Sequence, residues 1–141
     1  MKMASWLRAA AVLTLVVALG HTSGGIDRWS PPGDTDVLRS MASFHFDAVG
    51  SNRSYLDFYL DFGYVVSLYL FAQAALLWQL ASMGSVPGLQ VRSMVAIFIA
   101  VNVVTTAFAC AWLFVIPVVC NLLISICLAF AWFAAKREPS V

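Results

Sequence analysis

Residues 94–135 read MVAIFIAVNVVTTAFACAWLFVIPVVCNLLISICLAFAWFAA and contain no charged side chain. A helix that crosses a hydrocarbon core of about 30 Å needs about 20 apolar residues. The stretch is long enough for two such helices, and Pro117, which is tolerated in the first turn of a helix, marks the start of the second. We therefore expect transmembrane helices at about 94–114 and 117–135, which a short turn makes antiparallel neighbours.

Two more apolar stretches lie upstream, at about 55–81 and 6–25. The first is long enough to span a bilayer. The strictly apolar part of the second, Ala9–Gly20, is short and has the length of a signal-peptide h-region. Trp6 suits an interfacial anchor and Arg8 can extend to the membrane surface, so we expect a retained helix. The alternative is a signal peptide that is cleaved after this segment.

The composition also indicates a membrane protein, since 62% of the residues are hydrophobic and only 11% are charged. A soluble domain carries roughly 25% charged residues. We expect an all-α fold, a four-helix bundle forming one transmembrane domain over residues 1–141, with the lipid bilayer as its partner. The net charge of +1 without a basic tract argues against nucleic-acid binding. The cysteines lack metal-ligand spacing and are interpreted as buried free thiols: Cys110, Cys120 and Cys127.

The distribution of Lys and Arg predicts the orientation, because these residues are in excess on the cytoplasmic side of membrane proteins. With the N-terminus inside, five basic residues lie on the cytoplasmic side and three on the other. The five are Lys2, Arg8, Arg92, Lys136 and Arg137, and the three are Arg28, Arg39 and Arg53. Both ends of the chain are therefore expected in the cytoplasm.

The long connection between the first two helices is expected to contain an amphipathic helix at about 35–49. The expected turn, N-cap and stop residues are Pro31-Pro32-Gly33, Asp34 or Thr35, and Gly50. The apolar face of this helix would consist of Val37, Leu38, Met41, Phe44, His45 and Ala48. We expect the helix to lie on the outer membrane surface or across the mouth of the bundle.

Four titratable residues near the outer ends of the helices form a candidate polar cluster: His21, His45, Asp57 and Asp61. Asp57 and Asp61 are four residues apart and share one helix face. A carboxylate near hydrocarbon is costly and is a functional hypothesis by default. His21 ends the first helix and His45 lies on the apolar face of the loop helix, so we expect all four to converge near the outer surface. The alternatives are a binding site, a histidine–aspartate clasp and an ordinary ion-paired helix end.

Two imidazoles and two carboxylates suit a divalent metal or a proton relay, but these four come from separate elements and lack a spacing such as HxxxH. We therefore expect no metal and no cofactor. Side chains that would support the cluster are Trp29, Asp47, Arg53 and Tyr59. Arg53, four residues before Asp57, is its ion-pair partner in the helix-end interpretation.

Polar residues inside the apolar helices are interpreted as packing contacts, since such groups usually hydrogen-bond across helices. They are Asn102, Thr105 and Thr106 on one helix, and Asn121 and Ser125 on the next. Aromatic residues near the helix ends form the belt expected at membrane–water interfaces. They are Trp6, Trp29, Tyr55, Tyr59, Trp78, Trp112 and Trp132.

Five short stretches are distinctive: Gly20-His21-Thr22, 29–33 (WSPPG), 44–47 (FHFD), 55–59 (YLDFY) and 116–119 (IPVV). Together they resemble a family of small bacterial inner-membrane proteins of the leptospiral hypothetical-protein type. The resemblance covers nearly the whole chain and implies four transmembrane helices in a bacterial inner membrane, with no known activity. More loosely, the layout is similar to DoxX-type proteins and to the emopamil-binding group of sterol isomerases, which uses acidic residues in an intramembrane pocket. The helices of this chain contain no glutamate, so isomerase chemistry is not carried over.

These features lead to three functional hypotheses. The leading one is a non-enzymatic membrane protein that binds a small hydrophobic or cationic molecule, or a partner protein such as a second copy of the chain, at its outer rim. The second is a membrane enzyme that uses Asp61 and a histidine as an acid–base pair. The third is a small accessory subunit of a transporter or redox complex. An enzyme requires both catalytic groups to face a closed cavity, so the direction of Asp61 separates the first two hypotheses.

Overall fold

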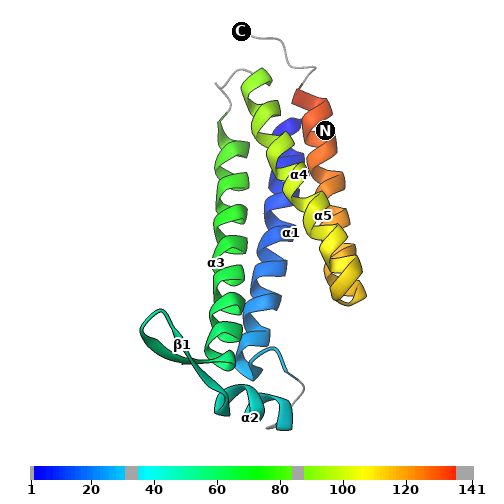
Figure 1. The fold of residues 1–141 in the computed structure, drawn as a ribbon. Coiled ribbons are helices and arrows are strands. Elements are labelled where there is room, and N and C mark those ends of the chain that lie inside the picture. The colour runs from blue at the N-terminus through cyan, green and yellow to red at the C-terminus, as the bar shows by residue number, and fades with distance from the viewer. Residues whose placement is uncertain (1, 31–34, 84–87, 136–141) are drawn as a thin grey trace. The chain divides into compact units, whose positions relative to one another are not determined.

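The computed structural model describes residues 2–30, 35–83 and 88–135 (Figure 1). Within this part of the chain, four helices are long and apolar enough to cross a membrane, as the sequence predicts. They are α1 (Met3–Gly24), α3 (Tyr55–Ser82), α4 (Gly88–Trp112) and α5 (Val115–Ala135). The shorter elements are the 3-10 helix η1 (Gly25–Asp27), α2 (Asp36–Ser43), and the strands β1 (His45–Ala48) and β2 (Ser51–Ser54).

The chain divides into two compact units, which are described separately. Unit 1 comprises Met1–Val17 and Phe71–Val141, and unit 2 comprises Ala18–Leu70. Unit 1 therefore contains α4 and α5 together with the first part of α1 and the last part of α3. Unit 2 contains the other parts of α1 and α3 and all the short elements that lie between them in the sequence.

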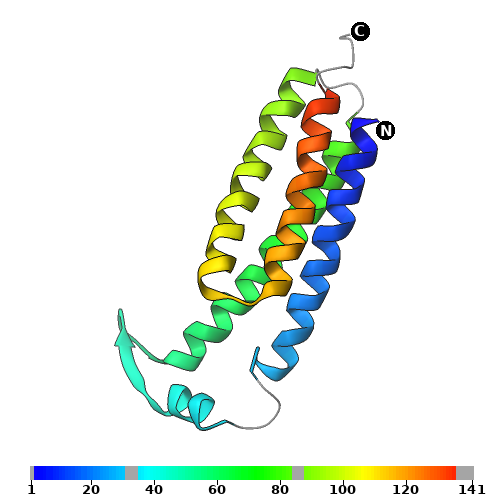
Figure 2. The same ribbon diagram turned by 90° about the vertical axis from the view of Figure 1, so that its right-hand side faces the viewer.

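Unit 1 is built around an apolar core to which all four of its helical segments contribute. The largest fully buried apolar side chains are Leu7, Leu77, Val91, Val95, Ile124 and Leu128. Trp6 stacks on Phe130 with the ring centroids 4.7 Å apart, so the start of α1 lies beside the last turns of α5. α4 and α5 pack along each other as antiparallel neighbours, joined by Leu113 and Phe114 (Figure 2).

One helix boundary in unit 1 differs clearly from the prediction. α4 begins at Gly88 and not near Met94, because the charge of Arg92 is accommodated within the helix. The guanidinium carbon of Arg92 lies 3.9 Å from the centroid of the Trp132 ring, a favourable cation–π contact. Pro117 is the third residue of α5, in the first turn, where its missing backbone N–H costs no helical hydrogen bond.

The polar residues of α4 form hydrogen bonds within their own helix. Asn102 Nδ2 donates to the carbonyl of Phe98, four residues back, at 2.8 Å. Thr105 and Thr106 donate to carbonyls four residues back in the same way. The predicted cross-helix contacts are therefore wrong for these three side chains, because the carbonyl one turn back is always within their reach. On α5, Ser125 Oγ is buried and has no hydrogen-bond partner among the described residues.

The three cysteines are free thiols, as the sequence predicts. Cys120 and Cys127 are half-buried, but Cys110 is exposed, so the prediction that all three are buried is wrong. The inward-facing position at this end of α4 is taken by the preceding residue, Ala109, which is buried. Cys110 is consequently turned toward the outside of unit 1.

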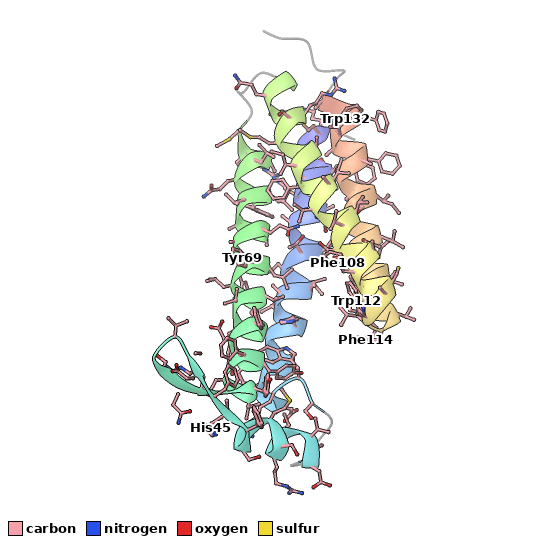
Figure 3. The ribbon with its side chains drawn as sticks, in the orientation of Figure 1. His45, Tyr69, Phe108, Trp112, Phe114 and Trp132 are labelled. Atoms are coloured by element: carbon pink, nitrogen blue, oxygen red, sulfur yellow. The ribbon has the colours of Figure 1, made fainter. Side chains whose placement is uncertain are left out.

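Aromatic side chains occur at both ends of the α4–α5 pair, as expected of helices that meet two membrane interfaces. Trp112 and Phe114 lie at the connection between the two helices, and Trp132 lies at the opposite end of α5 (Figure 3). Large apolar side chains also remain on the outer faces between these ends. Phe108 on α4 is 55% exposed, and Ile126 on α5 is 49% exposed.

In unit 2, the predicted loop helix at 35–49 is correct only in its first half. Thr35 caps α2, as predicted, by accepting a hydrogen bond from the backbone N–H of Leu38 at 3.3 Å. The helix ends at Ser43, because Phe44 adopts an extended backbone (φ −83°, ψ 110°). The predicted turn at Pro31-Pro32-Gly33 and the alternative cap Asp34 lie outside the described residues.

A β-hairpin replaces the second half of the predicted helix. β1 and β2 are antiparallel, with Ala48 opposite Ser51, so the hairpin loop consists of Val49 and Gly50. Both loop residues have positive φ, 54° and 82°, as a type I′ turn requires. Gly50 therefore supplies a tight turn between strands and not the end of a helix.

The side chains of β1 alternate between two environments. Phe46 and Ala48 are half-buried, whereas His45 and Asp47 are exposed. This period of two is the spacing of a strand with one covered face. The predicted position of His45 on the apolar face of a helix is therefore wrong, because a strand turns it to the opposite side from Phe46.

Candidate functional site

All four residues of the predicted polar cluster belong to unit 2, but no three of them gather in one place among the described residues. His21 lies in the last turn of α1 and His45 begins β1, while Asp57 and Asp61 lie in the first two turns of α3. His21 is half-buried, whereas the other three side chains are exposed. Unit 2 therefore forms a site around His21 that does not include the carboxylates.

Ser67 holds the His21 ring in one orientation. Nδ1 of His21 lies 3.0 Å from Ser67 Oγ, and the same hydroxyl donates to the carbonyl of Gly63 at 3.2 Å. A hydroxyl has one proton, so Ser67 accepts its bond to His21 from Nδ1–H. In the neutral imidazole, Nε2 is then unprotonated and can accept a hydrogen bond. Nε2 has no partner within the described part of the chain.

Ser67 is a site residue that the sequence analysis missed. It is buried in the long apolar helix α3. A signal for it exists, because Gly63 and Ser67 are four residues apart and share one helix face. Small residues at this spacing let two helices approach closely and let a hydroxyl bond across them.

Trp29 lies beside His21. The two ring centroids are 5.2 Å apart, and Nε1–H of Trp29 donates to the backbone carbonyl of His21 at 2.7 Å. Trp29 and the preceding Arg28 both have positive φ, 48° and 55°, which is strained for residues other than glycine. A backbone hydrogen bond of 2.8 Å from Trp29 to the carbonyl of Gly24 closes this turn. The turn thus holds the indole against the imidazole.

Three glycines make room for the Trp29 ring. A Cβ atom at Gly24 or Gly25 would lie 2.9 Å from a ring atom, and a Cβ atom at Gly63 would lie 2.2 Å from Cζ3. Cβ atoms essentially never approach other heavy atoms within 3.0 Å. The position of the ring therefore depends on glycine at all three positions.

Two tyrosines of α3 complete the surroundings of the indole. Tyr64 meets it edge to face with 5.2 Å between ring centroids, and Tyr59 does so at 6.4 Å. The Tyr59 hydroxyl also donates to the backbone carbonyl of Trp29 at 3.0 Å. Trp29 and Tyr59, which the sequence analysis expected to support the cluster, thus lie near His21, together with Tyr64, which it did not name. We refer to His21, Trp29, Tyr59, Tyr64 and Ser67 as the His21 site.

Asp57 helps Ser54, the residue before α3, to cap the N-terminus of the helix. Its Oδ2 accepts a hydrogen bond from the backbone N–H of Ser54 at 2.8 Å, and its own N–H donates to Ser54 Oγ at 3.2 Å. This reciprocal pair is a capping box, which satisfies two backbone donors that a helix start leaves unpaired. Asp57 is therefore a helix-end residue, as one of the three interpretations of the sequence expects. Its carboxylate, however, accepts a hydrogen bond from the backbone of Ser54 and does not pair with the side chain of Arg53.

The remaining candidates lie outside the His21 site. Asp61 is exposed and forms no hydrogen bond or ion pair with the described residues. His45 Nδ1 donates a hydrogen bond to the carbonyl of Ser43 at 3.1 Å. Its interaction with Asp57 is electrostatic, without a hydrogen bond between the two side chains. Asp47 is exposed on β1, where it is paired with Asn52 of β2. An acid–base pair of Asp61 with a histidine is therefore not formed.

The His21 site combines a hydrogen-bond acceptor with aromatic side chains. No three His, Cys, Asp or Glu side chains gather as a metal-binding group in the part of the chain that the structure describes. Nε2 of His21 is an acceptor without a partner among the described residues, and the His21 ring lies beside the ring of Trp29. Such a nitrogen can accept a hydrogen bond from the hydroxyl or amide N–H of an otherwise apolar molecule.

No family model, curated protein or solved structure matches the chain.

Proposed function

We propose that the chain is an integral protein of a bacterial inner membrane that crosses the bilayer four times, with both ends in the cytoplasm. The lengths and hydropathies of α1, α3, α4 and α5 support four spans. The basic residues support the orientation, because five of them lie on the side of the two termini and three lie in the long connection. The bacterial setting rests on the family resemblance in the sequence.

Exposed apolar side chains give the physical reason for a lipid environment. Removing one large apolar side chain from water is favourable by about 2 kcal/mol. Side chains such as Ile97, Phe108 and Phe133 remain 55–64% exposed on the outside of unit 1, and many others are similar. In water this surface would be a strong liability for aggregation, whereas lipid tails solvate it at no cost.

Cysteine labelling tests the orientation. In a variant with alanine at Cys110, Cys120 and Cys127, single cysteines are placed at two exposed serines, Ser51 of β2 and Ser82 of α3. A membrane-impermeant maleimide should label Ser51→Cys in intact spheroplasts and should label Ser82→Cys only after lysis, because α3 separates the two positions. Labelling of Ser82→Cys in intact spheroplasts would show that the orientation is inverted or that α3 does not cross the membrane.

At the His21 site, the chain binds a small hydrophobic molecule that carries a hydrogen-bond donor. The observation that carries this proposal is the bond from His21 Nδ1 to Ser67 Oγ, which leaves Nε2 as an acceptor without a partner among the described residues, in a ring beside that of Trp29. His21 lies within the candidate span Met3–Asp27, and an ionisable side chain inside a span commonly marks a functional site. The molecule therefore presents a hydroxyl or amide to Nε2 and an apolar body to lipid and to the rings.

Binding of para-hexylphenol and of its methyl ether to the protein in nanodiscs tests this function. The phenol can donate a hydrogen bond to Nε2, whereas the ether cannot. We expect His21→Phe to weaken phenol binding about tenfold, the value of one hydrogen bond of about 1.4 kcal/mol. Binding of the ether should not change.

The matched control for this experiment is His45→Phe, because His45 is exposed on the hairpin and lies outside the site. That variant should bind both compounds as the unmodified protein does. Equal affinities of the unmodified protein and His21→Phe for the phenol would refute the proposed acceptor role.

A further inference from the structure

The β-hairpin of unit 2 has a strained apolar tip. Val49 is fully exposed and has φ 54°, in the left-handed region. Glycine, asparagine or aspartate is usual at this position of a type I′ turn, and a β-branched residue is an outlier there. Strain of this kind persists where the surroundings or the function require it. In water, an exposed valine side chain gains no free energy of burial that could offset the strain of its backbone.

An aromatic ladder joins the hairpin to the first turn of α3. Phe44 stacks on Tyr55, and Phe46 stacks on Phe58, with ring centroids 5.3 Å and 5.5 Å apart. Phe46 and Tyr55 are also in contact, at 5.0 Å. The outer faces of Phe44 and Tyr55 remain more than half exposed. These residues therefore form a continuous apolar surface from the hairpin to the start of α3.

The start of α3 indicates what covers this surface. Tyr55 is the first residue of a candidate membrane span, at the level where aromatic side chains meet lipid headgroups. The polar side chains of β1, His45 and Asp47, are exposed on the face away from Phe46. An element with one apolar and one polar side at this level has the pattern of an interfacial anchor.

We propose that the hairpin is a second membrane anchor, whose tip residue Val49 and whose base residue Phe44 enter the outer leaflet beside α3. The inference rests on the membrane placement proposed above. Lipid is favoured over a protein partner because the apolar surface is continuous with the start of a membrane span. A two-stranded hairpin is also marginal by itself in water and needs such packing. His45 and Asp47 stay among the headgroups and water.

Spin-label accessibility in vesicles of phosphatidylethanolamine and phosphatidylglycerol tests the anchor. Single nitroxide labels are attached at position 49, at Asn52 on β2, and at Leu122, which is 48% exposed on the outside of α5. All three variants carry alanine at the native cysteines. Position 49 is fully exposed, so a label there displaces no described side chain.

Each nitroxide label collides with dissolved oxygen and with a water-soluble nickel complex, and lipid favours oxygen. If the hairpin is an anchor, the ratio of oxygen collisions to nickel collisions should be several-fold higher at positions 49 and 122 than at position 52. Equal ratios at positions 49 and 52, with a high ratio at 122, would overturn the anchor and leave the membrane placement intact. The tip would then stand in water, where a protein partner could cover it. A low ratio at 122 would refute the membrane placement, and the anchor with it.

Discussion

Replacing Gly63 with alanine is expected to destabilise the protein by about 3 kcal/mol, because the added methyl group must displace the packed ring of Trp29. The new Cβ would lie 2.2–2.6 Å from three atoms of the Trp29 ring. The ring cannot move aside cheaply, because Nε1 is bonded to the His21 carbonyl and two other glycines lie against it. Thermal unfolding in detergent micelles measures the loss.

Gly20→Ala is the matched control for this substitution. Gly20 is also a helical glycine, in α1, but a Cβ there meets no atom within 4 Å. Alanine is favoured over glycine in a helix by roughly 0.5–1 kcal/mol, so this variant should be as stable as the unmodified protein or slightly more stable. The two substitutions should therefore act in opposite directions. A Gly63→Ala protein that melts like Gly20→Ala would show that Trp29 does not occupy the space beside Gly63.

Truncation of Leu128 should produce a large loss of stability in unit 1. The Leu128 side chain is fully buried in the core, and Leu→Ala changes at such positions cost about 2–5 kcal/mol. Leu122 lies on the same helix but is 48% exposed on its outer face. Leu122→Ala should cost less than about 1 kcal/mol, because lipid or detergent fills the space that the side chain leaves. Similar losses for both variants, measured by thermal unfolding in the same detergent, would contradict the described core.

The four long helices could be predicted from the sequence because each contains a long, mainly apolar stretch, although the strictly apolar part of the first, Ala9–Gly20, is short. The hairpin could not be predicted as easily. Its turn consists of Val49 and Gly50, and valine is not a residue that signals a type I′ turn. The alternation of apolar and polar residues at 44–48 has the period of a strand, but five residues are too few to exclude a helix. The packing of Phe46 against Tyr55 and Phe58 decides between the two.

The candidate site was predicted in part. His21, Trp29 and Tyr59 were named in the sequence analysis, and the structure places them together. The expected carboxylates are absent from the site for a local reason. Asp57 is satisfied by backbone and side-chain groups of Ser54, three residues away, and such local contacts form at little entropic cost. The partner of His21 is instead Ser67, a distant residue that only the packing of α1 on α3 within unit 2 identifies.

The tautomer of His21 tests the central claim most directly. Long-range proton–nitrogen correlation spectra of the protein labelled with ¹⁵N-histidine, recorded at alkaline pH, distinguish a protonated Nδ1 from a protonated Nε2. Loss of the signal in His21→Gln assigns it. We predict that Nδ1 is protonated and Nε2 is bare, and that Ser67→Ala restores the mixture of tautomers found in a free imidazole. A protonated Nε2 in the unmodified protein, or a spectrum that Ser67→Ala leaves unchanged, would contradict the account.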